Sequence, residues 1–110
     1  MIRVAIDRSG DGTIRGFTLR GHAEYGEPGQ DIVCAGVSAV TFGTVNAAEA
    51  LLNVRLACED DQKAGLFKAE VPAVPDAATA DRLQLLLESM VVMLKSIEQS
   101  YGDYIRILRG

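Results

Sequence analysis

The sequence predicts an α/β (α+β) fold with the element order ββαββαβ, in which two helices pack on a mixed or antiparallel sheet. Short segments of alternating apolar and polar residues, typical of half-buried strands, are separated by two longer segments with helical spacing. The chain has 110 residues, 48% of them hydrophobic, which is enough for the core of one domain spanning residues 1–110.

Five segments have the period of a strand and are bounded by glycine, proline or clusters of polar residues. They cover residues 2–8, 13–20, 54–58, 66–72 and 103–109. The alternation of the second segment shifts at Gly16, which indicates a β-bulge. The first two segments form one predicted hairpin, and the polar turn at 59–65 joins the strands of another. The order of the strands in the sheet stays open.

Two segments, 32–53 and 77–100, are predicted helices. The first is apolar nearly all round, so we expect it to be covered on more than one side. It is long enough to raise the question of a membrane span, but its serine, threonine and asparagine residues favour a buried helix of a soluble protein. The second is amphipathic, with Asp76 as the expected N-cap and Gly102 as the expected stop.

Composition limits the possible partners. The formal net charge of −4 argues against a general phosphate-binding surface, so we expect no direct nucleic-acid partner.

The chain has two cysteines, Cys34 and Cys58. They are far apart in the sequence and do not resemble a disulfide framework, which favours free thiols in the cytoplasm. The N-terminus has no signal-peptide apolar region. The acidic run at 59–61 lacks a second cluster of ligands, so we expect no metal and no cofactor.

The informative segment runs from residue 21 to residue 38. Residues 21–31 contain three glycines and a proline without periodicity, which predicts a loop, and long loops of this kind are often functional covers. The loop joins His22, the one histidine of the chain, to Cys34 in the first turn of the long helix. Helix N-termini favour anions, so we expect a lowered thiol pKa at Cys34, with the same N–H groups available to an oxyanion.

The pair of His22 and Cys34 therefore suits nucleophilic attack on a carbonyl, with the imidazole as proton acceptor. The residues alone leave open that Cys34 is an inert buried thiol. Asp31 has two possible roles, as the helix cap or as the group that orients His22. Ser38 lies one turn after Cys34 and has two roles open, as a hydrogen-bond partner of the sulfur or as a small packing residue. Cys58 has no histidine nearby and is interpreted as structural.

This segment resembles the bacterial ribosomal-processing cysteine protease family. The resemblance also covers the length and element order of the whole chain. It rests on Gly21, His22, Ala23, Tyr25, Gly26, Gly29, Asp31, Ile32, Val33, Cys34, Ala35, Val37 and Ser38.

The resemblance implies a thiol protease whose catalytic pair is His22 and Cys34. It further implies removal of the N-terminal extension of a large-subunit ribosomal protein of the L twenty-seven family, and a homodimer. The loop containing Gly21, Tyr25, Gly26 and Gly29 then binds and covers the substrate. Two alternatives stay open: a non-enzymatic ribosome-assembly or peptide-binding module, and another thiol enzyme such as an acyl transferase or thioesterase.

Overall fold

The computed structural model describes residues 1–23 and 31–108. Within them, strands and helices alternate in the predicted order ββαββαβ. The elements are β1 (Ile2–Arg8), β2 (Ile14–Arg20), α1 (Ile32–Leu52), β3 (Ala57–Asp61), β4 (Leu66–Glu70), α2 (Ala77–Tyr101) and β5 (Ile105–Leu108).

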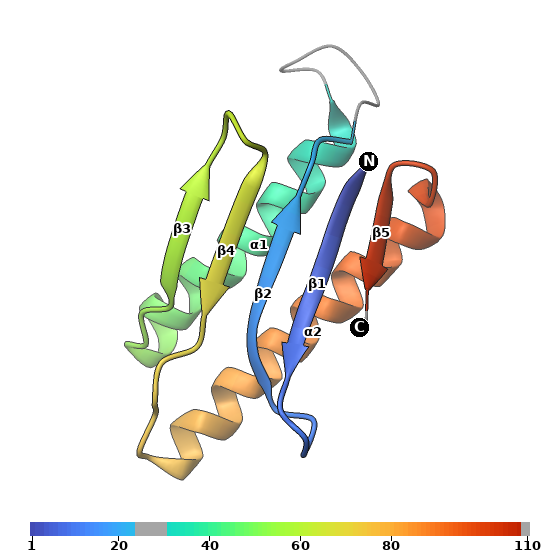
Figure 1. Cartoon of the computed structure of the whole chain (residues 1–110). Helices are drawn as coiled ribbons and strands as arrows, with labels where there is room; N and C mark the ends of the chain where they lie inside the picture. Colours follow the sequence, from blue (N-terminus) through green and yellow to red (C-terminus); the bar gives the residue numbers. More distant parts are fainter. Residues whose placement is uncertain (24–30, 109–110) are drawn as a thin grey trace.

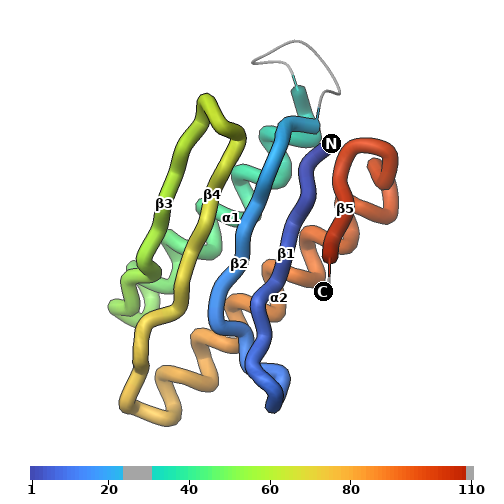
Figure 2. Tube along the Cα trace, in the orientation of Figure 1, coloured from blue at the N-terminus to red at the C-terminus, as the bar shows by residue number. Residues whose placement is uncertain are grey.

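The strands form a mixed sheet with the order β3-β4-β2-β1-β5 (Figure 1). β1 pairs in parallel with β5, and the other neighbouring strands are antiparallel. Both helices cover the same face of the sheet, and the trace shows them side by side behind the strands (Figure 2). The predicted fold class is therefore confirmed, and the structure adds the strand order.

The core lies between the sheet and the helices. The inward residues of β1, namely Ile2, Val4 and Ile6, are buried and alternate with exposed neighbours, as expected of a strand with one face covered. On α2 the apolar stripe that faces them is made of Leu83, Leu87, Met90, Val91 and Leu94. The predicted cap and stop of this helix are confirmed, because Asp76 caps it and Gly102 follows its last residue.

The bulge predicted at Gly16 is also present. Asp7 pairs with Gly16 and Arg8 with Ile14, so Arg15 is the extra residue on β2. A Cβ on Gly16 would lie 2.6 Å from the carbonyl oxygen of Ala69 on β4, so the close approach of the two strands requires glycine here.

The third strand was predicted wrongly at 54–58, with 59–65 as its turn. In the structure β3 spans Ala57–Asp61, and the turn is limited to 62–65. Val54 and Leu56, which suggested a strand, are instead buried parts of the connection from α1. All five residues of β3 are exposed, because an edge strand at the margin of the core needs no apolar alternation, and charged residues protect such edges from further pairing.

Within the single chain, α1 is covered on one side, and not on several as its composition predicted. Its buried residues are Val33, Val37, Thr41 and Ala48, while Leu51 is 72% exposed. α1 is long and apolar enough to cross a membrane by length and composition, and 22% of its most apolar window is buried. Its outer residues are exposed because α1 packs against α2 and, through Phe42 and Phe67, against β4, and no other described element packs closely against its remaining faces.

Candidate active site

Three segments that are distant in the sequence meet at one end of the sheet. The end of β2 carries His22, the start of α1 carries Cys34, and the β3–β4 turn at 62–65 lies beside them (Figure 1). The N-terminus lies at the same end, since β1 runs antiparallel to β2. The fold itself therefore brings together the histidine and the cysteine that the sequence singled out.

The backbone before His22 is held in one conformation. Gly21 has a φ of +90°, which favours glycine, and a Cβ there would overlap the carbonyl oxygen of Met1. Its N–H donates a hydrogen bond to the carbonyl oxygen of Gly65, at 2.8 Å. The chain thus leaves β2 between the N-terminus and the β3–β4 turn, and His22 follows at an exposed position.

Cys34 is the third residue of α1 and is half-buried. Asp31 caps the helix and accepts hydrogen bonds from the N–H groups of Val33 and Cys34, both at 3.0 Å. The sulfur of Cys34 accepts a hydrogen bond from the N–H of Ala23, at 3.4 Å. Since Ala23 directly follows His22, this contact ties the sulfur to the segment that carries the imidazole.

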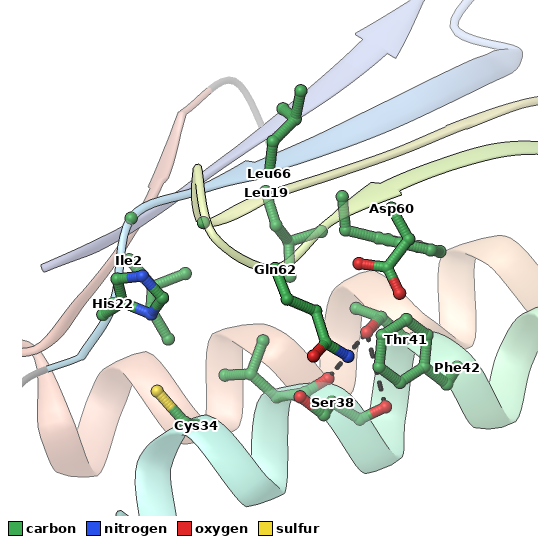
Figure 3. Close-up of a pocket in the computed structure, with 14 residues that line it drawn as sticks. Ile2, Leu19, His22, Cys34, Ser38, Thr41, Phe42, Asp60, Gln62 and Leu66 are labelled. Carbon is green, nitrogen blue, oxygen red and sulfur yellow. Dashed lines mark hydrogen bonds between the residues drawn. The ribbon is translucent and has the colours of Figure 1, made fainter. Parts of the chain in front are cut away.

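His22 and Cys34 line the same cavity of about 350 Å³ (Figure 3). The sulfur points from the first turn of α1 toward the imidazole. The cavity is lined by Ile2, Leu19, Gly21, His22, Cys34, Val37, Ser38, Thr41, Phe42, Asp60, Gln62, Gly65, Leu66 and Phe67. This size is sufficient for a few side chains of a bound peptide.

The far end of the cavity is mainly apolar. Phe42 of α1 and Phe67 of β4 contact each other edge to face, with ring centroids 4.7 Å apart. Gln62 and Asp60 direct polar groups from the β3–β4 hairpin toward the helix (Figure 3). A peptide lying in this cavity would therefore meet an apolar surface at the end away from the sulfur and polar groups along one rim.

The expected lowering of the Cys34 pKa is not found. Partial burial raises the pKa of the thiol above its ordinary value of 9.0, and the charge and hydrogen bonding of Asp31 raise it further, while the N–H of Ala23 lowers it. A lowered pKa would require helix N–H groups that are free to stabilise the thiolate. Asp31 already accepts from the N–H groups of Val33 and Cys34, so these two donors are also not available to an oxyanion.

The other predicted site residues have different outcomes. Gly21 and Ser38 line the cavity with His22 and Cys34. Asp31 is the helix cap. Tyr25, Gly26 and Gly29, predicted to form the substrate loop, lie outside the described residues.

Cys58 lies exposed on β3, apart from this cavity, and both cysteines are free thiols. Residues 1–23 and 31–108 contain no group of three or more histidine, cysteine, aspartate or glutamate residues able to hold a metal ion.

Sequence reasoning missed the contribution of the β3–β4 hairpin. Asp60, Gln62 and Gly65 line the cavity, although more than 25 residues separate them from Cys34. The glycine that ends the polar turn was the one available signal, because it marked a backbone position with special geometry. Nothing local indicated that this turn would meet His22.

Comparison with known proteins identifies the family. A family model described as cysteine protease Prp matches residues 1–106. The chain belongs to this cysteine protease family. It is 42% identical over 107 residues to the ribosomal processing cysteine protease Prp of Bacillus subtilis, covering 97% of this chain and 96% of that protein. The corresponding Prp of Staphylococcus aureus is 40% identical, with 97% of both chains covered.

Solved Prp structures have the same fold. The essential ribosomal processing protease Prp from S. aureus, in complex with a covalently linked product peptide, matches with a TM-score of 0.87 and 39% identity over 97% of both chains. The S. aureus protease in complex with a substrate peptide matches with a TM-score of 0.82 and 38% identity over 98% of both chains. The chain is thus a cysteine protease, similar in fold to relatives solved with bound peptides.

Proposed function

We propose that Cys34 is the nucleophile and His22 the acid and base of an endopeptidase that removes the N-terminal extension of a large-subunit ribosomal protein of the L twenty-seven family. The observation that carries this proposal is the single cavity in which the sulfur of Cys34 faces the imidazole of His22. The Prp relatives that process ribosomal proteins and bind peptides support the choice of substrate.

The raised thiol pKa defines how the first step proceeds. Cys34 rests as a neutral thiol, and no hydrogen bond joins it to His22 among the described residues, so the ring has to approach the sulfur when substrate binds. His22 then takes the proton as the sulfur attacks the scissile carbonyl. The C–S bond forms, and the carbonyl oxygen becomes an oxyanion.

The second step releases the two products in turn. His22 gives its proton to the leaving amine as the C–N bond breaks, which leaves the extension as a thioester on Cys34. His22 then takes a proton from water, the resulting hydroxide adds to the thioester, and the thiol leaves with the proton. No cofactor is needed in this sequence, because every proton passes through the imidazole.

The remaining residues support the pair. Asp31 holds the start of α1 and thereby the position of Cys34, at the expense of a higher thiol pKa. Ser38 lines the same cavity one turn further along α1, and Gly21 sets the direction in which the chain continues to His22. Phe42 and Phe67 accept an apolar or aromatic side chain before the cleaved bond.

The proposal includes a cytoplasmic homodimer with no membrane or direct nucleic-acid partner. The two free thiols suit a reducing compartment. Large apolar residues are exposed on both helices, and a second copy is the occupant we propose for this surface. They are Ile32 and Leu51 on α1, and Leu85, Val92 and Met93 on α2. A monomer by light scattering at micromolar concentration would contradict the dimer.

The test is cleavage of a synthetic peptide that spans the extended terminus of the ribosomal protein, followed by mass analysis. We expect wild type and the control Cys58→Ser to cleave at one bond, and Cys34→Ser to bind without cleaving. Undiminished function of Cys34→Ser in cells would favour the assembly module instead. A trapped acyl group on Cys34 that is not a peptide would favour an acyl transferase or thioesterase.

A further inference from the structure

The β3–β4 turn is in direct contact with the imidazole of His22. Gly65, the last residue of this turn, has a φ of +64°. A Cβ on Gly65 would lie 2.9 Å from Nε2 of His22 and 3.3 Å from its Cδ2. The backbone of Gly65 therefore lies against the ring without any side chain between them.

Hydrogen bonds hold Gly65 in this place. Its N–H donates to the carbonyl oxygen of Gln62 across the turn, at 3.2 Å, and its carbonyl accepts from the N–H of Gly21, at 2.8 Å. The second bond joins the turn to the residue before His22. Figure 3 shows the turn between Gln62 and Leu66 beside the imidazole.

His22 needs such a support because of where it lies. It follows the end of β2, at an exposed position outside any strand or helix. A side chain there keeps several rotamers unless neighbouring atoms exclude them. Gly65 occupies one side of the ring, and the distance from Nε2 leaves no room for even a methyl group.

We infer that Gly65 is a positioning residue that limits the imidazole of His22 to orientations facing Cys34, from which the ring approaches the sulfur when substrate binds. The inference rests on the proposed function, in which His22 moves the protons. A side chain at position 65 would push the ring away from the reacting atoms. Small displacements of a catalytic group lower the rate of the chemical step more than substrate binding.

The experiment has to separate this contact from backbone strain, because a residue with positive φ favours glycine for both reasons. Gly12 provides a matched control: it has a φ of +90° in the β1–β2 turn, with open space where a Cβ would lie. Gly65→Ala and Gly12→Ala both place a Cβ at a positive φ, but only the Cβ at position 65 meets neighbouring atoms, namely the imidazole and, at 3.3 Å, the carbonyl oxygen of Gly21. Gly65→Asn is the second variant, because asparagine tolerates this backbone conformation while its Cβ still meets the ring.

We expect Gly65→Ala and Gly65→Asn to lower kcat for the extension peptide by roughly 10- to 100-fold with little change in KM. Gly12→Ala should keep the wild-type kcat although its positive φ lowers the melting temperature. Since the chain has one histidine, its imidazole resonances are assigned without ambiguity by NMR. They should move in both Gly65 variants and stay in place in Gly12→Ala.

Wild-type kcat and unmoved imidazole resonances in the two Gly65 variants would overturn the inference. His22→Ala separates this failure from that of the proposed function. If His22→Ala is inactive while Gly65→Ala is as active as Gly12→Ala, only the positioning role is wrong. If His22→Ala cleaves the peptide at the wild-type rate, the proposed pair is wrong, and the contact with Gly65 has no catalytic consequence.

Discussion

The starts of the two helices are built alike, yet only one of them lies in the proposed active site. Asp31 caps α1 and Asp76 caps α2. In each helix the third residue, Cys34 or Thr79, donates its N–H to the cap carboxylate at 3.0 Å. The Thr79 hydroxyl also donates to Asp76. Both helices thus pair N–H groups of their first turn with the carboxylate of an N-cap aspartate.

The two helix starts differ in the side-chain chemistry of the third residue and in the segments that contact it. Hydrogen bonds from Thr79 lower the pKa of Asp76, and the Thr79 hydroxyl itself is not an ionisable group. Cys34 has an ionisable thiol, whose pKa is raised by burial and by Asp31. It also meets Ala23, and through it the segment that carries His22. A capped helix start therefore does not activate a thiol by itself, and in the proposed mechanism the segment after β2 provides the base, His22.

The largest expected effect comes from removing His22, the proposed base, because the start of α1, like the start of α2, then has no base beside it. We expect His22→Ala to lower peptide cleavage by about 10²–10⁴-fold, the usual contribution of a general base. Thr79→Cys places a thiol at the matching position of α2, where a cap but no histidine is present. Without bound peptide Cys34 is a neutral thiol with no hydrogen bond to His22 among the described residues. At neutral pH it should therefore react with iodoacetamide no faster than the introduced thiol, in wild type and in His22→Ala alike.

Peptide mass mapping assigns the alkylation to each cysteine in these variants. Cys58, which is exposed on β3, is the internal reference in every sample. Faster alkylation of Cys34 than of the thiol introduced by Thr79→Cys, lost in His22→Ala, would show that the imidazole activates the sulfur before substrate binds, against the proposed first step.

A smaller effect is expected from Asp31→Asn, which keeps the cap but removes its charge. Asparagine caps helices about as well as aspartate, so the melting temperature should change little. Because Asp31 helps to raise the Cys34 pKa above its ordinary value of 9.0, the alkylation rate of wild type rises only at alkaline pH. The variant should begin this rise at lower pH, with alkylation at pH 7 faster by roughly threefold to tenfold.

Asp76→Asn is the matched control and should leave the alkylation profile of Cys34 unchanged. The peptide assay then separates the two roles considered for Asp31. Faster alkylation of Cys34 with retained cleavage fits an Asp31 that caps the helix and whose charge disfavours the thiolate. Faster alkylation with lost cleavage would instead fit a carboxylate that orients His22.

The smallest expected effect concerns stability alone. Asp76→Ala removes the cap of α2, and we expect the melting temperature to fall by about 5 °C with unchanged cleavage. The Asp76 pKa is lowered from its ordinary value of 3.8, so its stabilising contribution is present above that value and is lost as the pH falls through the lower folded value. Differential scanning fluorimetry along a descending pH series should show the difference between wild type and variant shrinking in acid.

Much of the fold could be predicted because it follows from local patterns. Alternation placed β1 and β2, and the spacing of Leu83, Leu87 and Leu94 placed α2, since each pattern reflects which face of an element is buried. Asp76 could be recognised as a cap for the same reason. The edge strand β3 could not be placed in this way, because neither of its faces is buried.

In the candidate site too, some features follow from local sequence and others depend on tertiary packing. His22 and Cys34 could be chosen from their residue types and the glycine-bearing loop between them. The contact of Gly65 with the imidazole could not be anticipated, because it depends on how the β3–β4 hairpin lies next to the end of β2. The direction of the Cys34 pKa shift was missed as well, because it depends on partial burial and on which donors Asp31 already occupies.

Residue order alone was enough for the kind of chemistry and the succession of elements, since a thiol, an imidazole and a hydrophobic period are properties of short segments. The working environment of the sulfur arises only when distant segments pack together. Burial, the neighbouring carboxylate and the turn against the imidazole are set by atoms far apart in the chain, and electrostatic and steric effects depend on separation in space rather than along the sequence.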